Sequence, residues 1–249
     1  MAIFASPNIV TDGLVLYVDP GNNKSYVSGS TTIADLSGEN NNGTLANGVA
    51  YTDDNMGSLI FDGVNDYISI SSNFNSFGNI IGNGFTIELW MKTTSNVYSQ
   101  ILGTTNNGNS VNISISTNRG VSSRDNLNSP GATQFYLRDV NGAFLVGYIT
   151  TNIYDGLWHN IKWRIVDTTS SYFDCYVDGV LQQINYTDQE TLTSWSNFDF
   201  SLLIGCLNNR GTASAFSNIE IAKTSIYNRA LTEAEIKQSF NALRGRFGL

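Results

Sequence analysis

Asp-Gly and Asn-Gly dipeptides recur along this chain, and short runs rich in valine, isoleucine, threonine and aromatic residues lie between them. Such dipeptides supply the positive φ that tight hairpin turns require. The runs between them have the length and composition of β-strands. The chain is therefore predicted to fold into many short strands joined by hairpins. Among these dipeptides are Asp12-Gly13, Asn47-Gly48, Asp62-Gly63, Asn83-Gly84, Asn141-Gly142, Asp155-Gly156 and Asp178-Gly179.

No helical segment alternates with these predicted strands. A regular βαβα pattern would indicate a parallel sheet, so its absence favours two packed antiparallel sheets. The loop-rich stretch 104–132 is interpreted as an insertion in one sandwich, and a single domain is expected over residues 1–249. The predicted strands are 14–19, 58–63, 66–71, 85–94, 111–117, 133–139, 159–167, 171–179, 200–206 and 217–227.

Two of the predicted strands show a clear alternation of side chains. In the stretch 85–91 the odd-numbered positions are all apolar, and in the stretch 159–165 His159 shares the apolar face. Alternation of this kind is typical of a strand with one face on the core and the other in water. The residues expected on the solvent face are Thr86, Glu88, Trp90, Asn160, Lys162 and Arg164.

The C-terminal segment carries clear helix signals. Thr232 and Glu235 have the spacing of a capping box, in which each side chain accepts a hydrogen bond from the backbone N–H of the other residue. A helix is therefore predicted at about 232–244. Only one side of it is apolar, so it is expected to dock on the sandwich as a structural latch rather than to bind a partner. The apolar stripe consists of Ile236, Phe240 and Leu243.

The formal net charge is −8, and the 13 lysines and arginines are scattered along the chain. Nucleic-acid phosphates require clustered basic residues, so no nucleic-acid partner is expected. No apolar run approaches the roughly 18 residues of a membrane span, so no membrane insertion is expected. The opening MAIFASPNIVTDG lacks the charged and apolar regions of a secretory signal, and none is predicted.

The chain carries, in order, the segments SLIFDGVNDYISI, FTIELWMKTT, DGLWHNIKWRI, CYVDGVLQ, LLIGC and FSNIEIAKTSIYNRALTEAEI. In this order they resemble the laminin-G-like, concanavalin-A-like lectin/glucanase domains. The resemblance runs from about residue 10 to residue 243. It implies an all-β fold, an antiparallel two-sheet jelly-roll β-sandwich with one short C-terminal α-helix. Such folds serve as lectins, glycan hydrolases, adhesion modules and spacers, so the function must be sought in the site residues.

The opening NIVTDGLVLYVDPGN, the segment DLSGENNNGTL and the ending FNALRGRFGL are similar to virion structural proteins of tailed bacteriophages, especially those that infect cyanobacteria. This resemblance implies a virion surface protein assembled in the host cytoplasm, either a capsid decoration or a fibre-associated adhesin. Its implied partners are other virion subunits, host cell-surface glycans and further copies of itself. A free-standing carbohydrate-binding lectin or adhesion module is the alternative.

Catalytic motifs are missing from the sequence. Hydrolases of the resembled fold carry Glu-x-Asp-x-Glu on one strand, and a retaining mechanism needs two carboxyl groups about 5–5.5 Å apart. No glutamate of this chain stands in that pattern, and the single histidine, His159, lies on the predicted core face. The chain is therefore predicted not to be an enzyme, and a glycoside hydrolase is the less favoured alternative.

Calcium is the one metal that the sequence favours, because it binds six to eight oxygens supplied by aspartate, asparagine and backbone carbonyls. Laminin-G-like and pentraxin-like relatives often hold calcium at loop rims, and the resemblance implies the same here. Asx turns that need no ion are the alternative. The first choice is Asp62, Asn65 and Asp66. The other clusters are Asp19 with Asn22 and Asn23, and Asp35 with Asn40, Asn41 and Asn42.

Glycan binding requires aromatic faces that stack on sugar C–H groups and planar polar groups that bond to hydroxyls. Glu88 and Trp90 on one strand, and Tyr136 and Arg138 on another, are the predicted carbohydrate-binding residues. The alternative is that a loop or a neighbouring subunit covers these aromatic side chains. Further options are Tyr98, Tyr148 and the loop that contains Asn208, Asn209 and Arg210.

Overall fold

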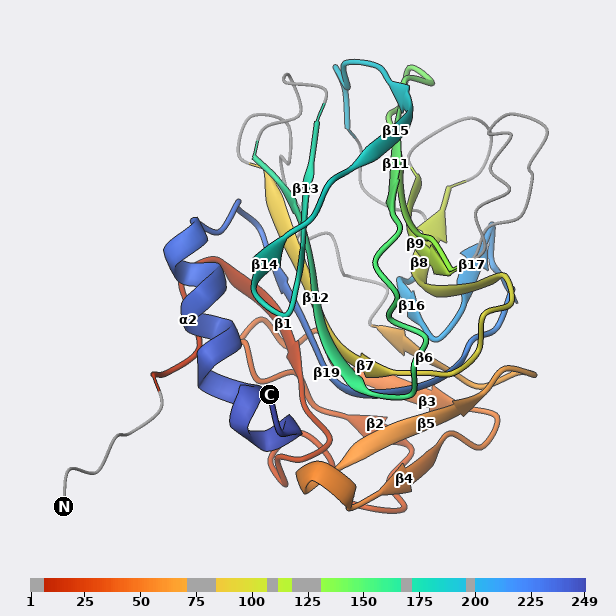
Figure 1. Cartoon of the computed structure of the whole chain (residues 1–249). Helices are drawn as coiled ribbons and strands as arrows, with labels where there is room; N and C mark the ends of the chain where they lie inside the picture. The colour runs from red at the N-terminus through yellow and green to blue at the C-terminus, as the bar shows by residue number, and fades with distance from the viewer. Residues whose placement is uncertain (1–6, 71–83, 107–111, 118–130, 167–171, 196–199) are drawn as a thin grey trace, which may run out of the picture.

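The computed structural model describes residues 7–70, 84–106, 112–117, 131–166, 172–195 and 200–249. Two antiparallel sheets form a sandwich, and an α-helix near the C-terminus packs on its outside (Figure 1). The predicted all-β, two-sheet fold with one C-terminal helix is confirmed. The assignment of the whole chain to a single domain stays a prediction.

The first sheet, sheet A, has β7 and β12 near its centre. Strand β7 pairs with β12 on one side and with β19 on the other, so that Glu88 lies opposite both Lys162 and Ser225. In order across the sheet, the strands are β14 (Val180–Leu181), β13 (Asp174–Val177), β12 (Trp158–Ile165), β7 (Phe85–Lys92), β19 (Asn218–Tyr227), β5 (Ser58–Asp62) and β4 (Ala50–Thr52), and β1 (Leu14–Val18) also pairs with β19.

The second sheet, sheet B, is larger. In order across it, the strands are β15 (Asn185–Gln189), β11 (Phe144–Ile149), β10 (Thr133–Arg138), β9 (Asn112–Thr117), β8 (Ser99–Thr105), β16 (Leu203–Ile204), β6 (Tyr67–Ile70), β3 (Gly43–Ala46) and β2 (Thr32–Ile33). The hairpin of β17 (Leu207–Asn209) and β18 (Thr212–Ser214) joins the sheet through a short parallel contact between β17 and β8. A 3-10 turn, η1 (Asp54–Met56), connects β4 to β5.

The core lies between the two sheets and contains a cluster of stacked aromatic rings. The Phe135 ring of sheet B stacks on Trp163 of sheet A with centroids 5.3 Å apart, and Phe173 meets both rings edge-on. All three side chains are fully buried. Burial of one such side chain stabilises a fold by roughly 1.5–3 kcal/mol, so this cluster holds the two sheets together.

The predicted helix is present as α2 (Glu233–Leu243), and a 3-10 turn, η3 (Arg244–Phe247), continues it. The capping box is confirmed: Thr232 Oγ1 accepts a hydrogen bond from the Glu235 N–H, and Glu235 accepts one from the Thr232 N–H. Arg229 donates two hydrogen bonds to the same carboxylate, and this contact lowers the pKa of Glu235 to about 2. The helix therefore starts from a fixed and charge-balanced end.

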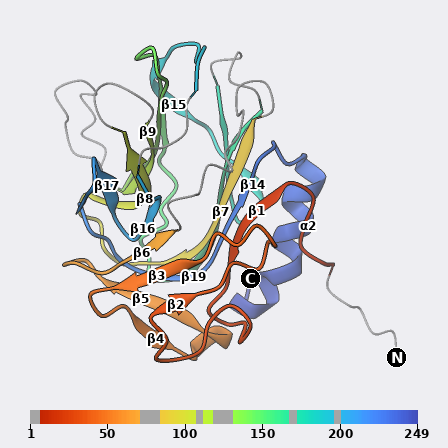
Figure 2. The same ribbon diagram turned by 180° about the vertical axis from the view of Figure 1, so that it is seen from behind.

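Helix α2 lies across the outer face of sheet A, beside β1 and β14 (Figures 1 and 2). Glu88, Trp90 and Lys162, which were expected to face solvent, are fully buried beneath it. The expected exposure of these residues is wrong because alternation separates the two faces of a strand but does not reveal whether another element covers the polar face.

Candidate functional site

Aromatic side chains line the outer face of sheet B, on the neighbouring strands β10 and β11. The register places Arg138 opposite Phe144 and Gln134 opposite Tyr148, and cross-strand partners share a face of the sheet. The residues between them, such as Phe135, point into the core. We call the outward set the aromatic strip, and it consists of Tyr136, Arg138, Phe144 and Tyr148.

Side chains of the aromatic strip touch one another and remain partly accessible. The Arg138 guanidinium lies 4.9 Å from the centre of the Phe144 ring, and the Tyr136 ring meets Phe144 edge-on with centroids 5.7 Å apart. All four members of the strip are half-buried. Mutual packing fixes the orientations of Tyr136, Arg138 and Phe144, as a binding surface requires. The strip thus combines aromatic rings with a planar guanidinium, the two kinds of group that contact sugars.

The structure separates the two pairs of residues that were predicted to bind carbohydrate. Tyr136 and Arg138 lie together on the outer face of sheet B, whereas Glu88 and Trp90 lie in sheet A beneath α2. No part of the Glu88 or Trp90 side chain is exposed. These two residues cannot meet a sugar while α2 is in place, so the proposed role for them is wrong.

Glu88 instead forms a buried charge cluster. Its Oε1 atom lies 3.0 Å from Lys162 Nζ, and its Oε2 atom lies 3.0 Å from Lys223 Nζ. Asn160 Nδ2 donates a hydrogen bond of 3.0 Å to Oε1. Each of these side chains is fully buried. A charge in such a place is stable only when it is paired, and the cluster provides that pairing.

The protonation states in this cluster depend on its composition, which is one carboxylate and two lysine side chains. Burial alone would raise the pKa of Glu88, but attraction to the two lysines outweighs burial and lowers it to about 2. Burial lowers the pKa of Lys162, and the nearby Lys223 adds to this effect against the attraction of Glu88. One carboxylate faces two lysine amines, so it stays ionised while Lys162 loses its proton more readily than a free lysine.

The turn between β5 and β6 contains the residues predicted to bind calcium. Asp62 Oδ1 accepts hydrogen bonds from the N–H groups of Val64 and Asn65, which is an Asx turn. Asp66 Oδ2 accepts one from the Asp62 N–H at 3.2 Å. The Asp66 Oδ1 atom is buried and has no hydrogen-bond partner. Burial, together with repulsion from Asp62, raises the pKa of Asp66. A cation at this rim would satisfy that oxygen.

The other two predicted oxygen clusters are closed hydrogen-bond networks. Asp35 accepts hydrogen bonds from the N–H groups of Tyr17, Ser37 and Asn41. Asp19 accepts one from the Gly21 N–H and forms an ion pair with Arg246. Their carboxylate oxygens are engaged within the fold, so these two clusters are structural.

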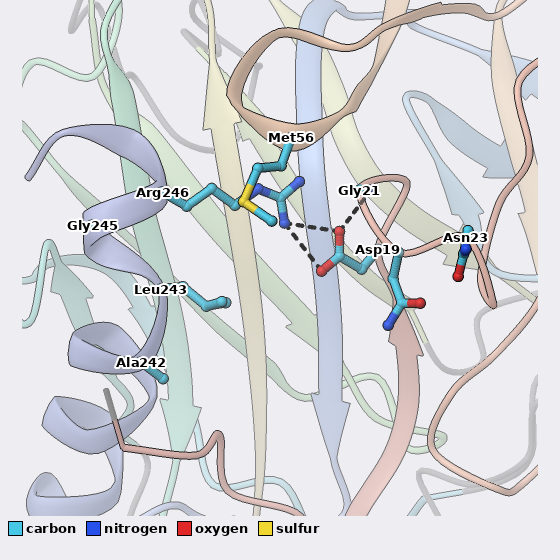
Figure 3. Close-up of a pocket in the computed structure, with 9 residues that line it drawn as sticks. Asp19, Gly21, Asn23, Met56, Ala242, Leu243, Gly245 and Arg246 are labelled. Atoms are coloured by element: carbon cyan, nitrogen blue, oxygen red, sulfur yellow. Dashed lines mark hydrogen bonds and ion pairs between the residues drawn. The ribbon is translucent and has the colours of Figure 1, made fainter. Parts of the chain in front are cut away.

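A cleft of about 760 Å³ lies between the turn after β1, the 3-10 turn η1 and the end of α2 (Figure 3). Arg246 reaches across it to the two carboxylate oxygens of Asp19, at 2.9 and 3.1 Å. The guanidinium also donates to the carbonyl oxygens of Asn55 and Gly57, both at 2.6 Å. Met56 lines the cleft and is 68% exposed. No local sequence signal indicates this contact, because Asp19 and Arg246 lie near opposite ends of the chain.

His159 lies at the end of strand β12 rather than deep in the core. Its Nδ1 atom is 2.8 Å from Asp178, and its Nε2 atom is 3.2 Å from Asp155. Asp178 is the main reason that the pKa of His159 is raised, and burial opposes it. Both ring nitrogens are occupied by carboxylates, so this histidine stabilises the strand end and is not placed to act as a general base.

The chain belongs to the concanavalin A-like lectin/glucanases superfamily, since a laminin-G-type model of that superfamily matches residues 61–237. No curated protein matches the chain at a significant level. In the part of the chain that the structure describes, no helix has both the length and the apolar character of a membrane span.

Several solved structures share this fold. The receptor binding domain of botulinum neurotoxin C/D mosaic serotype has a TM-score of 0.67 and 16% identity, over 93% of this chain and 51% of that one. The binding domain of Paraclostridial Mosquitocidal Protein 1 has a TM-score of 0.64 and 18% identity, over 93% and 52%. The botulinum neurotoxin serotype D ligand binding domain in complex with N-acetylneuraminic acid has a TM-score of 0.64 and 15% identity. That match covers 93% of this chain and 51% of the other. This chain thus spans about half of their length.

Proposed function

We propose that this chain is a non-catalytic glycan-binding module that uses the aromatic strip. The observation that carries this proposal is the contact of Arg138 and Tyr136 with the same Phe144 ring, where all three side chains are partly accessible. Fixed rings stack on the C–H faces of sugars, and a fixed guanidinium bonds to hydroxyl or carboxylate groups. Structures of similar fold include a receptor binding domain and a ligand binding domain in complex with N-acetylneuraminic acid, and they support a binding role here.

The absence of catalysis is part of this proposal. Glu88 is the glutamate that the hydrolase alternative would use, and it is buried and ionised between two lysines. The general acid of a glycoside hydrolase must reach the glycosidic oxygen of a bound sugar and be protonated at rest near neutral pH. Glu88 meets neither condition, because it is buried away from any external substrate and rests ionised.

The setting that we propose is the surface of a bacteriophage particle. The resemblance of the opening and closing segments to virion structural proteins supports it. On a particle, many weak sites acting together raise avidity by factors on the order of 10²–10⁴. The exposed edge strand β14, with Val180 63% and Leu181 54% exposed, offers an apolar contact for neighbouring virion subunits or a second copy. Antibodies raised against this protein should label the surface of the phage particle in electron micrographs. Particles without label would contradict this setting.

Glycan binding is tested by presenting the protein as a monomer and as a dense array on beads to envelope polysaccharides, while reducing ends are assayed. We expect binding by the array, much weaker binding by the monomer and no release of reducing ends. Tyr136→Ala and Arg138→Ala should each weaken binding about tenfold, a loss of about 1.4 kcal/mol. Met56→Ala in the cleft is the matched control and should bind normally. Loss of binding in Met56→Ala, with normal binding in the two strip variants, would indicate that the glycan binds in the cleft.

We also propose that the rim formed by Asp62, Asn65 and Asp66 holds calcium. The unpartnered Asp66 Oδ1 atom supports this assignment, because a buried carboxylate oxygen without a partner is unfavourable. Carboxylate and carbonyl oxygens suit this ion. Bound calcium would neutralise the two aspartates and stiffen the turn between β5 and β6.

A further inference from the structure

Three of the side chains buried beneath α2 contact one another in a way that the fold alone does not require. Glu88 Oε1 contacts two different nitrogen atoms, Lys162 Nζ at 3.0 Å and Asn160 Nδ2 at 3.0 Å. Lys162 and Asn160 lie two residues apart on β12, so their side chains share the face that α2 covers. We call Lys162, Asn160 and Glu88 the buried triad.

The amine of the buried triad lies next to the amide of its neighbour. Lys162 Nζ is 2.5 Å from Asn160 Oδ1. A carbonyl bond is about 1.2 Å long, so Nζ lies no more than about 3.7 Å from the amide carbon Cγ. Attack requires the reacting atoms to come within about 3–3.5 Å with their orbitals aligned, and the hydrogen bond from Nζ to Oδ1 holds this pair close to that separation.

The surroundings favour a nucleophilic amine. All members of the triad are fully buried, and a lysine attacks only after it loses its proton. Lys223 Nζ lies 3.0 Å from Glu88 Oε2 and balances the charge of the carboxylate. The charges of Glu88 and Lys223 cancel each other. A protonated Lys162 would therefore be an additional buried charge without a partner of its own, which is costly. Burial and Lys223 accordingly lower the pKa of Lys162.

We propose that Lys162 and Asn160 join in an intramolecular isopeptide bond, and that Glu88 transfers the proton. The neutral Nζ attacks Cγ, and Glu88 Oε1 takes a proton from Nζ as the new C–N bond forms. Glu88 then gives this proton to Nδ2, the Cγ–Nδ2 bond breaks, and ammonia leaves. The products are a secondary amide between the two side chains and one ammonia, with the Glu88 carboxylate regenerated. No oxidant, metal or cofactor is needed.

The position of Glu88 indicates that it transfers the proton from Lys162 to Asn160. One oxygen atom contacts both the nitrogen that must lose a proton and the nitrogen that must gain one. A general base that becomes a general acid within a reaction needs this placement. Helix α2 completes the site, because the Ile236 carbonyl oxygen accepts a contact of 3.4 Å from Lys162 Nζ. The reaction therefore requires the folded chain.

The decisive experiment is the intact mass of the denatured full-length protein. The proposal predicts a mass lower than that of the sequence by one ammonia. After tryptic digestion, the chain should remain uncleaved after Lys162, and an amine reagent applied in denaturant should label every other lysine but not Lys162. An unchanged mass, with cleavage and labelling at Lys162, overturns the proposal without the use of any variant.

Two variants separate the isopeptide bond from other losses of ammonia. Asn160 could also cyclise onto its own backbone, and that product would persist in Lys162→Arg, whereas the isopeptide bond requires Lys162. Loss of ammonia that persists in Lys162→Arg therefore overturns the proposal. Asn160→Asp should reach the same final mass as the wild type, through loss of water. A tandem mass spectrum that places the linkage between residues 160 and 162 completes the proof.

Discussion

The indole ring of Trp90 in sheet A stacks on the ring of Phe247, with centroids 4.3 Å apart and planes 18° from parallel. Phe240 of α2 stacks on the same indole at 5.8 Å. The C-terminal segment thus seals the outer face of β7, where Glu88 and its two lysines lie. The helix that the sequence signals so clearly is a cover for buried charge and not an appendage.

Phe247→Ala should therefore destabilise the whole domain. Removal of a buried aromatic side chain costs about 3–5 kcal/mol, from lost burial and the cavity that remains. Denaturant unfolding followed by tryptophan fluorescence measures this loss. Leu249→Ala is the control, since that side chain is 42% exposed and its removal should change little. Equal unfolding midpoints for both variants would show that the helix end contributes nothing to the fold.

Glu88→Gln should destabilise the protein by about 3–5 kcal/mol, because it leaves the Lys223 ammonium buried without its partner. The loss appears in the free energy of unfolding at neutral pH. Asp12→Asn removes a carboxylate that pairs with Arg229 but is 85% exposed, so it should cost less than about 1 kcal/mol. If the two variants lose the same amount, the buried cluster does not stabilise the fold as its geometry indicates.

His159 should make stability depend on pH above the ordinary histidine pKa of about 6.5. Its pKa is raised in the folded state, mainly by the hydrogen bond to Asp178. The stabilisation is then complete below the unfolded pKa of about 6.5 and is lost as the pH rises through the folded value. Unfolding free energies at a series of pH values test this. The advantage of the wild type over His159→Gln should shrink toward alkaline pH, and a constant difference would contradict the assignment.

The sequence predicts the sandwich and its capped helix because hairpin turns, strand alternation and the capping box are local signals. It does not predict short strands such as β2 and β4, which long-range pairing defines. The same limit explains the errors at Glu88 and Trp90. Which polar face is covered depends on how the last residues of the chain return across sheet A. Tyr136 and Arg138 are partly accessible, as alternation alone predicts, and their role in carbohydrate binding stays a prediction.

Calcium should raise the melting temperature if the rim of Asp62 and Asp66 binds it, because a ligand of the folded state stabilises by mass action. The shift should vanish in chelator and in Asp66→Asn, which replaces the carboxylate whose Oδ1 atom lacks a partner. Asp53→Asn lies on another exposed turn and is the control. Identical melting curves with calcium and with chelator would leave only the Asx turn observed at Asp62.

The central claim is that a glycan binds on the aromatic strip. The most direct measurement is a crystal structure of the protein with the envelope oligosaccharide that it binds best. We predict a sugar ring packed against Tyr136 or Phe144, with its polar groups bonded to Arg138. A sugar seated instead in the cleft beside Met56 and Arg246, or elsewhere on the molecule with the strip unchanged, would contradict the account.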